Sequence, residues 1–87
     1  MLRLVYSPDF IRKYKKFNSA AGYEIKERLE EFKNPSNHQK LKVHKLKGTM
    51  KGQYAFSLNY RDRVIFEWSK DKKTAHILDV GDHSIYE

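Results

Sequence analysis

Apolar positions in the first half of the chain recur at the spacing of α-helices. Ser7, Pro8 and Asp9 supply an N-cap, a first-turn proline and a first-turn acid. The apolar residues that follow at helical spacing are Phe10, Ile11, Tyr14 and Phe17 in one segment, and Ala21, Ile25, Leu29 and Phe32 in the next. Residues 2–6 form a short β-like run before them. The pattern predicts a strand and then a hairpin of two helices, which ends before residues 34–37.

From residue 53 onward the apolar positions recur at every second residue, which is the period of a β-strand. One predicted face carries Tyr54, Phe56, Leu58 and Tyr60, and the other carries Gln53, Ala55, Ser57 and Asn59. Residues 63–68 and 74–80 continue as strands after short polar turns, so this half predicts an antiparallel meander. The strand at 2–6 pairs most simply with an edge of it. We therefore expect an α+β fold over a single domain, residues 1–87, in which the N-terminal strand and an αα-hairpin pack on a curved, mainly antiparallel sheet.

Composition narrows the functional classes. The sequence has no cysteine, so neither a disulfide framework nor a thiolate nucleophile is available. No stretch approaches the ~20 apolar residues of a membrane span, and the start does not resemble a signal peptide. These features predict a cytoplasmic protein with no membrane partner and no cofactor, small-molecule or otherwise.

The positive charge is concentrated in one short segment. The net charge is +7, and the segment KLKVHKLKGTMK at residues 40–51 holds five lysines and no acid. Leu41, Val43 and Leu46 alternate with those lysines, which predicts that one side of the segment is anchored and the other presents ammonium groups. Such a surface suits a polyanion.

The sequence lacks the motifs that several common kinds of active site require. No glycine-rich phosphate loop is present, and the serines have no nucleophile-elbow motif. The four histidines, His38, His44, His76 and His83, show no compact metal-ligand spacing, so no metal site is expected. Imidazole, lysine, arginine and tyrosine remain. They suffice for RNA cleavage, because the RNA 2′-hydroxyl is itself the nucleophile and the protein supplies only a base, an acid and cations.

Each candidate has a competing structural explanation. His44 lies inside the lysine segment and His83 follows a strand end, and both positions suit surface histidines. The structural explanation is an ion pair with Glu67 for Arg63, packing on the sheet edge for Tyr86, and turn chemistry for Asp62. His76 is expected to be structural and His38 solvated. The candidate RNA- and phosphate-binding residues are Lys42, Lys45, Lys47, Lys51 and Arg61.

Two stretches, HKLKGTMKGQYAFSLNYRDRVIFEW and AHILDVGDHSIYE, resemble the bacterial RelE/ParE toxin superfamily. The likeness lies in a Leu–x–Gly motif with a second glycine, a tyrosine strand, an arginine before VIFE, and a terminal Gly–x–His with a nearby aromatic. The pattern is most similar to YafQ-like mRNA interferases, which have histidines where His44 and His83 stand. Two features depart from that branch. Tyr86 stands one residue nearer to His83 than usual, and Asp79 replaces an arginine, so the cation would come from Arg63 or a lysine.

The resemblance implies a type II toxin that docks at the ribosomal decoding site, against 16S rRNA, and cleaves mRNA without a metal. His44 or Asp62 would assist removal of the 2′-proton, and Arg63 with the lysines would stabilise the phosphorane. His83 would protonate the leaving 5′-oxygen, and Tyr86 would stack on or orient a base. The resemblance also implies an antitoxin protein as partner.

Two alternatives share the same residues. A ParE-like relative would inhibit DNA gyrase without nuclease activity, although such proteins generally lack the histidine pair His44 and His83. A catalytically inactive, basic RNA-binding relative would bind RNA in a salt-sensitive way without turnover.

Overall fold

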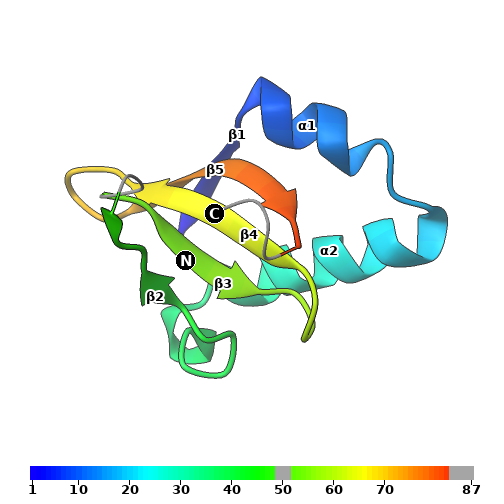
Figure 1. Ribbon diagram of the computed structural model, residues 1–87. Coiled ribbons are helices and arrows are strands. Elements are labelled where there is room, and N and C mark those ends of the chain that lie inside the picture. The colour runs from blue at the N-terminus through cyan, green and yellow to red at the C-terminus, as the bar shows by residue number, and fades with distance from the viewer. Residues whose placement is uncertain (49–51, 83–87) are drawn as a thin grey trace.

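The fold has two helices and a five-stranded mixed sheet. The computed structural model describes residues 1–48 and 52–82. The elements are β1 (Arg3–Tyr6), α1 (Pro8–Tyr14), α2 (Ser19–Phe32), the 3-10 helix η1 (Pro35–Asn37), β2 (His44–Lys45), β3 (Tyr54–Ser57), β4 (Arg63–Trp68) and β5 (Thr74–Gly81). The strand order is β1-β5-β4-β3-β2 (Figure 1). The predicted α+β class is confirmed.

Both helices begin where the sequence places capping residues. The Ser7 side chain accepts a hydrogen bond from the Phe10 backbone N–H at 3.0 Å, and Pro8 occupies the first turn of α1. Asn18 accepts from the Ala21 N–H at 2.9 Å and starts α2 in the same way. Each cap satisfies a backbone donor that has no partner within its helix, so the hairpin is fixed at two points by local sequence.

The meander is antiparallel, and β1 joins it at one edge. Tyr54 on β3 lies opposite Phe66 on β4, and Arg63 lies opposite Gly81 on β5. The predicted pairing of the first strand with an edge of the meander is also correct. Its direction is parallel to β5, with Arg3 opposite Thr74. A parallel neighbour requires a long connection, and the chain between β1 and β5 contains both helices and the other three strands.

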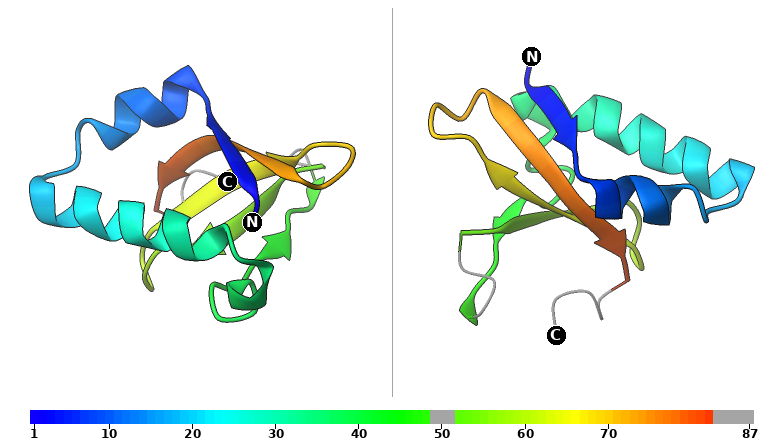
Figure 2. Two further views of the ribbon diagram at one scale, coloured as in Figure 1. Left: turned by 180° about the vertical axis from the view of Figure 1, so that it is seen from behind. Right: turned by 90° about the horizontal axis from the view of Figure 1, so that it is seen from above.

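The core lies between the helices and one face of the sheet. Figure 2 shows α1 and α2 on the same side of the sheet. Phe32 of α2 is fully buried, and its ring centroid lies 4.4 Å from that of Phe56 and 4.8 Å from that of Phe66. Ile25 and Leu29 are buried on the same side of α2. Within residues 1–48 and 52–82, the other face of the sheet carries no helix, and we call it the helix-free face.

The structure departs from the predicted apolar pattern at two positions. The pattern places Tyr60 on one strand face with Phe56 and Leu58, but β3 ends at Ser57 and Tyr60 is 93% exposed. Ile11 was placed on the apolar stripe of α1, but it is 42% exposed. Phe10 is the only buried residue of α1.

The expectations for two histidines are also wrong. His38 is not simply solvated: its ring stacks on Phe32 with centroids 4.8 Å apart, and its Nε2 lies 2.8 Å from the Phe32 carbonyl oxygen. His76 was expected to be structural, but it is exposed. It lies opposite Glu67 on the helix-free face, where strand alternation turns it away from the core.

Candidate functional site

The helix-free face of the sheet is organised by strand register. His44 of β2 lies opposite Ala55, and Ala55 lies opposite Ile65 of β4. Ala55, Ile65 and Leu46 form a small buried cluster, against which Leu78 packs. Because directly opposite residues share a face, His44 projects from the same side as this cluster. Arg63 is two residues from Ile65 on β4, so alternation points its Cα–Cβ bond to that side, and its side chain lies at the end of the sheet, where it also lines a pocket with residues of α2.

His44 is exposed and held by a single backbone contact. Its Nδ1 lies 2.9 Å from the carbonyl oxygen of Lys42. A carbonyl only accepts, so Nδ1 is the donor, and a neutral ring then carries its free lone pair on Nε2. That tautomer presents the nitrogen of a general base to solvent and to a substrate on this face.

Arg63 is held by carbonyl groups. Its Nη1 donates to the carbonyl oxygens of Asn59 at 2.7 Å and Asp62 at 3.0 Å. Carbonyls orient a guanidinium without neutralising its charge, so Arg63 keeps a full positive charge and further N–H donors. Among the described residues no ion pair joins Arg63 to Glu67. Four residues along a strand separate their Cα atoms by about 13 Å.

Asp62 is engaged in the turn between β3 and β4. Its N–H donates to Asn59 Oδ1 at 2.7 Å, and its carboxylate accepts from Asn59 Nδ2 and Arg61 Nε, both at 3.4 Å. The Leu58 N–H donates to the Asp62 carbonyl at 3.0 Å. These contacts match the structural explanation of Asp62 as a turn residue, and they also support the two carbonyls that orient Arg63.

The lysine segment is anchored as predicted. Leu41 is 3% exposed, Leu46 is 9% exposed, and Val43 packs against the main core. The described lysines that lie between or directly beside these anchors are exposed, namely Lys40, Lys42, Lys45 and Lys47. Lys42 has a φ of 60°, a left-handed conformation that reverses the chain direction just before β2. The alternation thus turns apolar side chains inward and ammonium groups outward.

Several predicted site residues cannot be placed together. His83, Tyr86 and Lys51 lie outside the described residues. Register places the Cα atoms of His44 and Arg63 two strands and two residues apart, or roughly 12 Å. A phosphodiester group fits between two long side chains at that separation. Of the predicted catalytic set, the structure therefore brings His44 and Arg63 to one face, with Asp62 adjoining Arg63.

Asp79, which replaces an arginine of the resembling branch, has a partner on α1. Lys13 Nζ lies 2.7 Å from Asp79 Oδ1. The same carboxylate oxygen accepts from the Val80 N–H at 2.8 Å. The position therefore contributes a neutralised pair that ties α1 to β5, and the cations nearest to the candidate site are Arg63 and the lysines.

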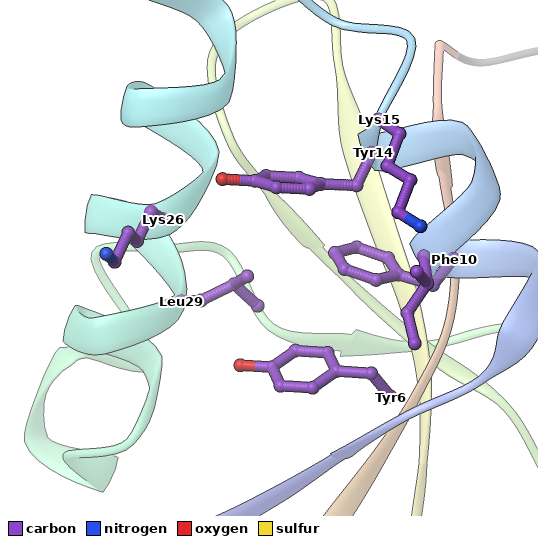
Figure 3. A pocket seen from close by; sticks show the side chains of 7 residues that line it. Tyr6, Phe10, Tyr14, Lys15, Lys26 and Leu29 are labelled. Carbon is purple, nitrogen blue, oxygen red and sulfur yellow. The ribbon is translucent and has the colours of Figure 1, made fainter. Parts of the chain in front are cut away.

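An apolar groove lies between the two helices, away from the helix-free face. The rings of Tyr6, Phe10 and Tyr14 stack in a column with centroid separations of 5.4 and 5.9 Å (Figure 3). Leu29 of α2 faces this column, and Lys26 and Lys15 also line the groove, whose volume is about 350 Å³. Burial is the largest cause that raises the pKa of Tyr6 above its ordinary value of 10.0. The groove is apolar inside and cationic at its edges.

The described residues contain no cluster of three or more potential metal ligands. Within residues 1–48 and 52–82, no helix is long and apolar enough to cross a membrane. These findings concern only the part of the chain that the structure describes.

The overall fold is shared with solved bacterial and archaeal toxins. No protein-family model matches the sequence, and no curated protein matches it. A chain of the YoeB–YefM complex from Staphylococcus aureus matches with 23% sequence identity and a TM-score of 0.73, covering 95% of this chain and 98% of the other. A chain of the archaeal RelE–RelB complex from Pyrococcus horikoshii matches with 23% identity and a TM-score of 0.70, covering 93% of each chain. The intact Escherichia coli RelBE complex also matches (19%, 0.71, 94% and 96%). The chain therefore has the RelE/ParE toxin fold. The narrower likeness to YafQ-like proteins stays a prediction.

Proposed function

We propose that this protein is the toxin of a type II toxin–antitoxin system and acts in the cytoplasm as a ribosome-dependent mRNA endonuclease. The observation that carries the proposal is the placement of His44 and Arg63 on one helix-free face, beside an anchored lysine segment. The shared fold supports the toxin assignment, because the matched structures are toxin–antitoxin complexes. The remaining support comes from the sequence resemblance.

The proposed reaction uses the RNA's own hydroxyl group. His44 Nε2 accepts the 2′-hydroxyl proton as the 2′-oxygen forms a bond to the adjacent phosphorus. Arg63 and the lysines stabilise the negative charge of the phosphorane. The bond from phosphorus to the 5′-oxygen then breaks, and His83 donates a proton to that oxygen. The products are a 2′,3′-cyclic phosphate and a free 5′-hydroxyl, and Tyr86 stacks on a neighbouring base.

Asp62 fits a positioning role better than that of a base. Its carboxylate is already shared between Asn59 and Arg61, whereas His44 offers an uncommitted ring nitrogen. Within the proposal, Asp62 fixes the turn whose carbonyls aim Arg63 at the phosphate.

The groove between α1 and α2 is the proposed docking surface for the antitoxin. A helix that is apolar on one side would cover Tyr6 and Ile11, which are exposed large hydrophobic side chains. Acidic residues flanking that apolar side would meet Lys15 and Lys26. This surface is separate from the helix-free face, so binding there and catalysis involve different residues.

Primer extension on mRNA in a reconstituted translation system tests the nuclease proposal. We expect cuts phased with codons on ribosomes, weakened by about 10²–10⁴-fold in His44→Ala, because a general base contributes that much. His76→Ala is the matched control, since His76 is also exposed, and it should cleave normally. Naked mRNA is run in parallel to measure ribosome dependence.

Two results would refute the proposal. Intact mRNA together with failure of DNA supercoiling by gyrase would place the protein with the ParE-like inhibitors. Equal cleavage by wild type and His44→Ala would remove His44 from the mechanism.

A further inference from the structure

A second, polar pocket adjoins Arg63 at the end of the sheet near the β3–β4 turn. Its volume is about 270 Å³. It lies between the second half of α2, the loop before β2 and the β3–β4 turn. The residues that line it are Arg28, Glu31, Lys40, Leu41, Lys42, Ser57, Leu58, Asn59, Tyr60 and Arg63. Arg28 was not a predicted site residue, because it stands within the mixed charges of an ordinary amphipathic helix.

Positive charge predominates in this pocket. Four cationic side chains line it beside one carboxylate, that of Glu31. Arg28 Nε lies 3.2 Å from Glu31 Oε1, and Lys40 Nζ lies 3.2 Å from Glu31 Oε2. Arg28 Nε and Glu31 Oε1 are buried without a well-directed hydrogen bond. Arg28 also lies 3.9 Å from Glu27, whereas Lys42 and Arg63 have no ion pair with a described residue, so the pocket attracts an anion.

An exposed aromatic ring stands at the same pocket. Tyr60 is 93% exposed, although a tyrosine ring usually has part of its surface covered. It sits in the turn held by Asn59, whose Oδ1 accepts from the N–H groups of Arg61 at 2.9 Å and Asp62 at 2.7 Å. A ring presented on a fixed turn beside cations is the combination with which proteins hold single-stranded nucleic acids: bases stack and phosphates pair.

The pocket is connected to the candidate catalytic residues. Lys42 lines it, and the Lys42 carbonyl is the group that orients His44. Arg63 lines it as well, and the Asn59 carbonyl that orients Arg63 belongs to the same turn as Tyr60. A strand of RNA that passes between His44 and Arg63 therefore runs beside this pocket.

We infer that the pocket is a subsite for a nucleotide of single-stranded RNA next to the cleavage point. The phosphate lies between Lys42 and Arg63, and the base stacks on Tyr60. The inference rests on the proposed function for the position of the cut, but binding at the pocket is measurable without cleavage.

Fluorescence anisotropy with a labelled RNA oligonucleotide tests the pocket. The RNA carries 2′-deoxy sugars at the cleavage position, so it cannot be cut. Lys42→Asn removes the charge and keeps a residue that tolerates positive φ, and it should lower the salt-dependence slope of log K by about 0.7. Tyr60→Ala should weaken binding about tenfold and leave that slope unchanged. Lys70→Gln, an exposed lysine in the β4–β5 turn, should bind as wild type does.

The outcomes separate the two proposals. Loss of binding in both pocket variants supports the subsite even if wild type cleaves nothing, a result that would refute only the nuclease. Wild-type affinity in both variants, or no RNA binding by wild type, overturns the subsite whether or not cleavage occurs. Equal affinity for a polyglutamate peptide, lost in the same variants, would also overturn it, because an acidic protein segment would then be the ligand.

Discussion

At the scale of single residues, variants of Asp62 test whether its carboxylate positions Arg63 or accepts the 2′-hydroxyl proton. Its contacts in the turn predict that Asp62→Asn, which keeps the shape and an oxygen acceptor, lowers ribosome-dependent cleavage by no more than a few-fold. Asp62→Ala should cost more, because the turn that aims Arg63 loses its acceptor. Cleavage rates measured across pH decide the role.

The pH profile distinguishes a positioning residue from a base. For a positioning role, the rising limb of the rate against pH stays in place in Asp62→Asn and is altered in His44→Ala. Abolished cleavage in Asp62→Asn, with an unchanged unfolding midpoint, would instead make Asp62 the base.

At the scale of elements, the β4–β5 turn carries a pH-dependent contribution to stability. Asp71 Oδ1 accepts from Ser69 Oγ at 2.7 Å and from the Lys73 N–H at 3.0 Å. The side-chain bond from Ser69 is the larger cause that holds the pKa of Asp71 below its ordinary value of 3.8. A carboxyl whose pKa is depressed by folding stabilises the fold above the unfolded pKa, and this stabilisation is lost as the pH falls through the folded value.

The variant Asp71→Ala tests the direction in which this stabilisation changes with pH. The variant should unfold at lower urea than wild type near neutral pH, and the gap should narrow well below pH 3.8. Asp71→Asn keeps an oxygen acceptor but cannot ionise. Near neutral pH its urea midpoint of unfolding should lie between those of wild type and Asp71→Ala. A gap that widens in acid would contradict the assignment of the turn contacts.

Element types were predictable because their signals are local. The cap at Ser7 and the period of two in the meander depend on neighbouring residues, so the pattern identifies them, whereas the cap at Asn18 was found in the structure. The exposure of Tyr60 was not predictable from alternation, because it depends on β3 ending at Ser57. The exposure of Ile11 depends on the tertiary packing of α1, in which only Phe10 is buried.

At the scale of the whole molecule, the site was only partly predictable. The lysine segment and its anchors follow from alternation, and the register then places His44 with Arg63. Arg28 could not be predicted as a pocket residue, because its neighbours there are distant in sequence: α2 contacts the loop before β2 only in the folded protein. The stacking of His38 on Phe32 was missed for the same reason.

Mutation should separate the role proposed for the groove, antitoxin binding, from the role proposed for the helix-free face, catalysis. Ile11→Arg places a charge on the apolar groove surface, and because Ile11 is 42% exposed the fold should tolerate it. Coexpression with the product of an adjacent antitoxin gene should rescue growth from wild type but not from Ile11→Arg. Lys70→Gln is the control and should be rescued. Equal rescue of all three would move the antitoxin to another surface.

The parallel pairing of β1 with β5 also sets an order of events during synthesis. Arg3 lies opposite Thr74, and Ser7 Oγ donates to the Leu78 carbonyl 71 residues away. At translation rates of about 5–20 residues per second, β1 waits roughly 4–14 seconds for its neighbour. Both helices and β2 to β4 emerge before β5, the strand that joins β1 to the rest of the sheet. A nascent chain therefore carries no completed sheet until β5 has left the ribosome that makes it.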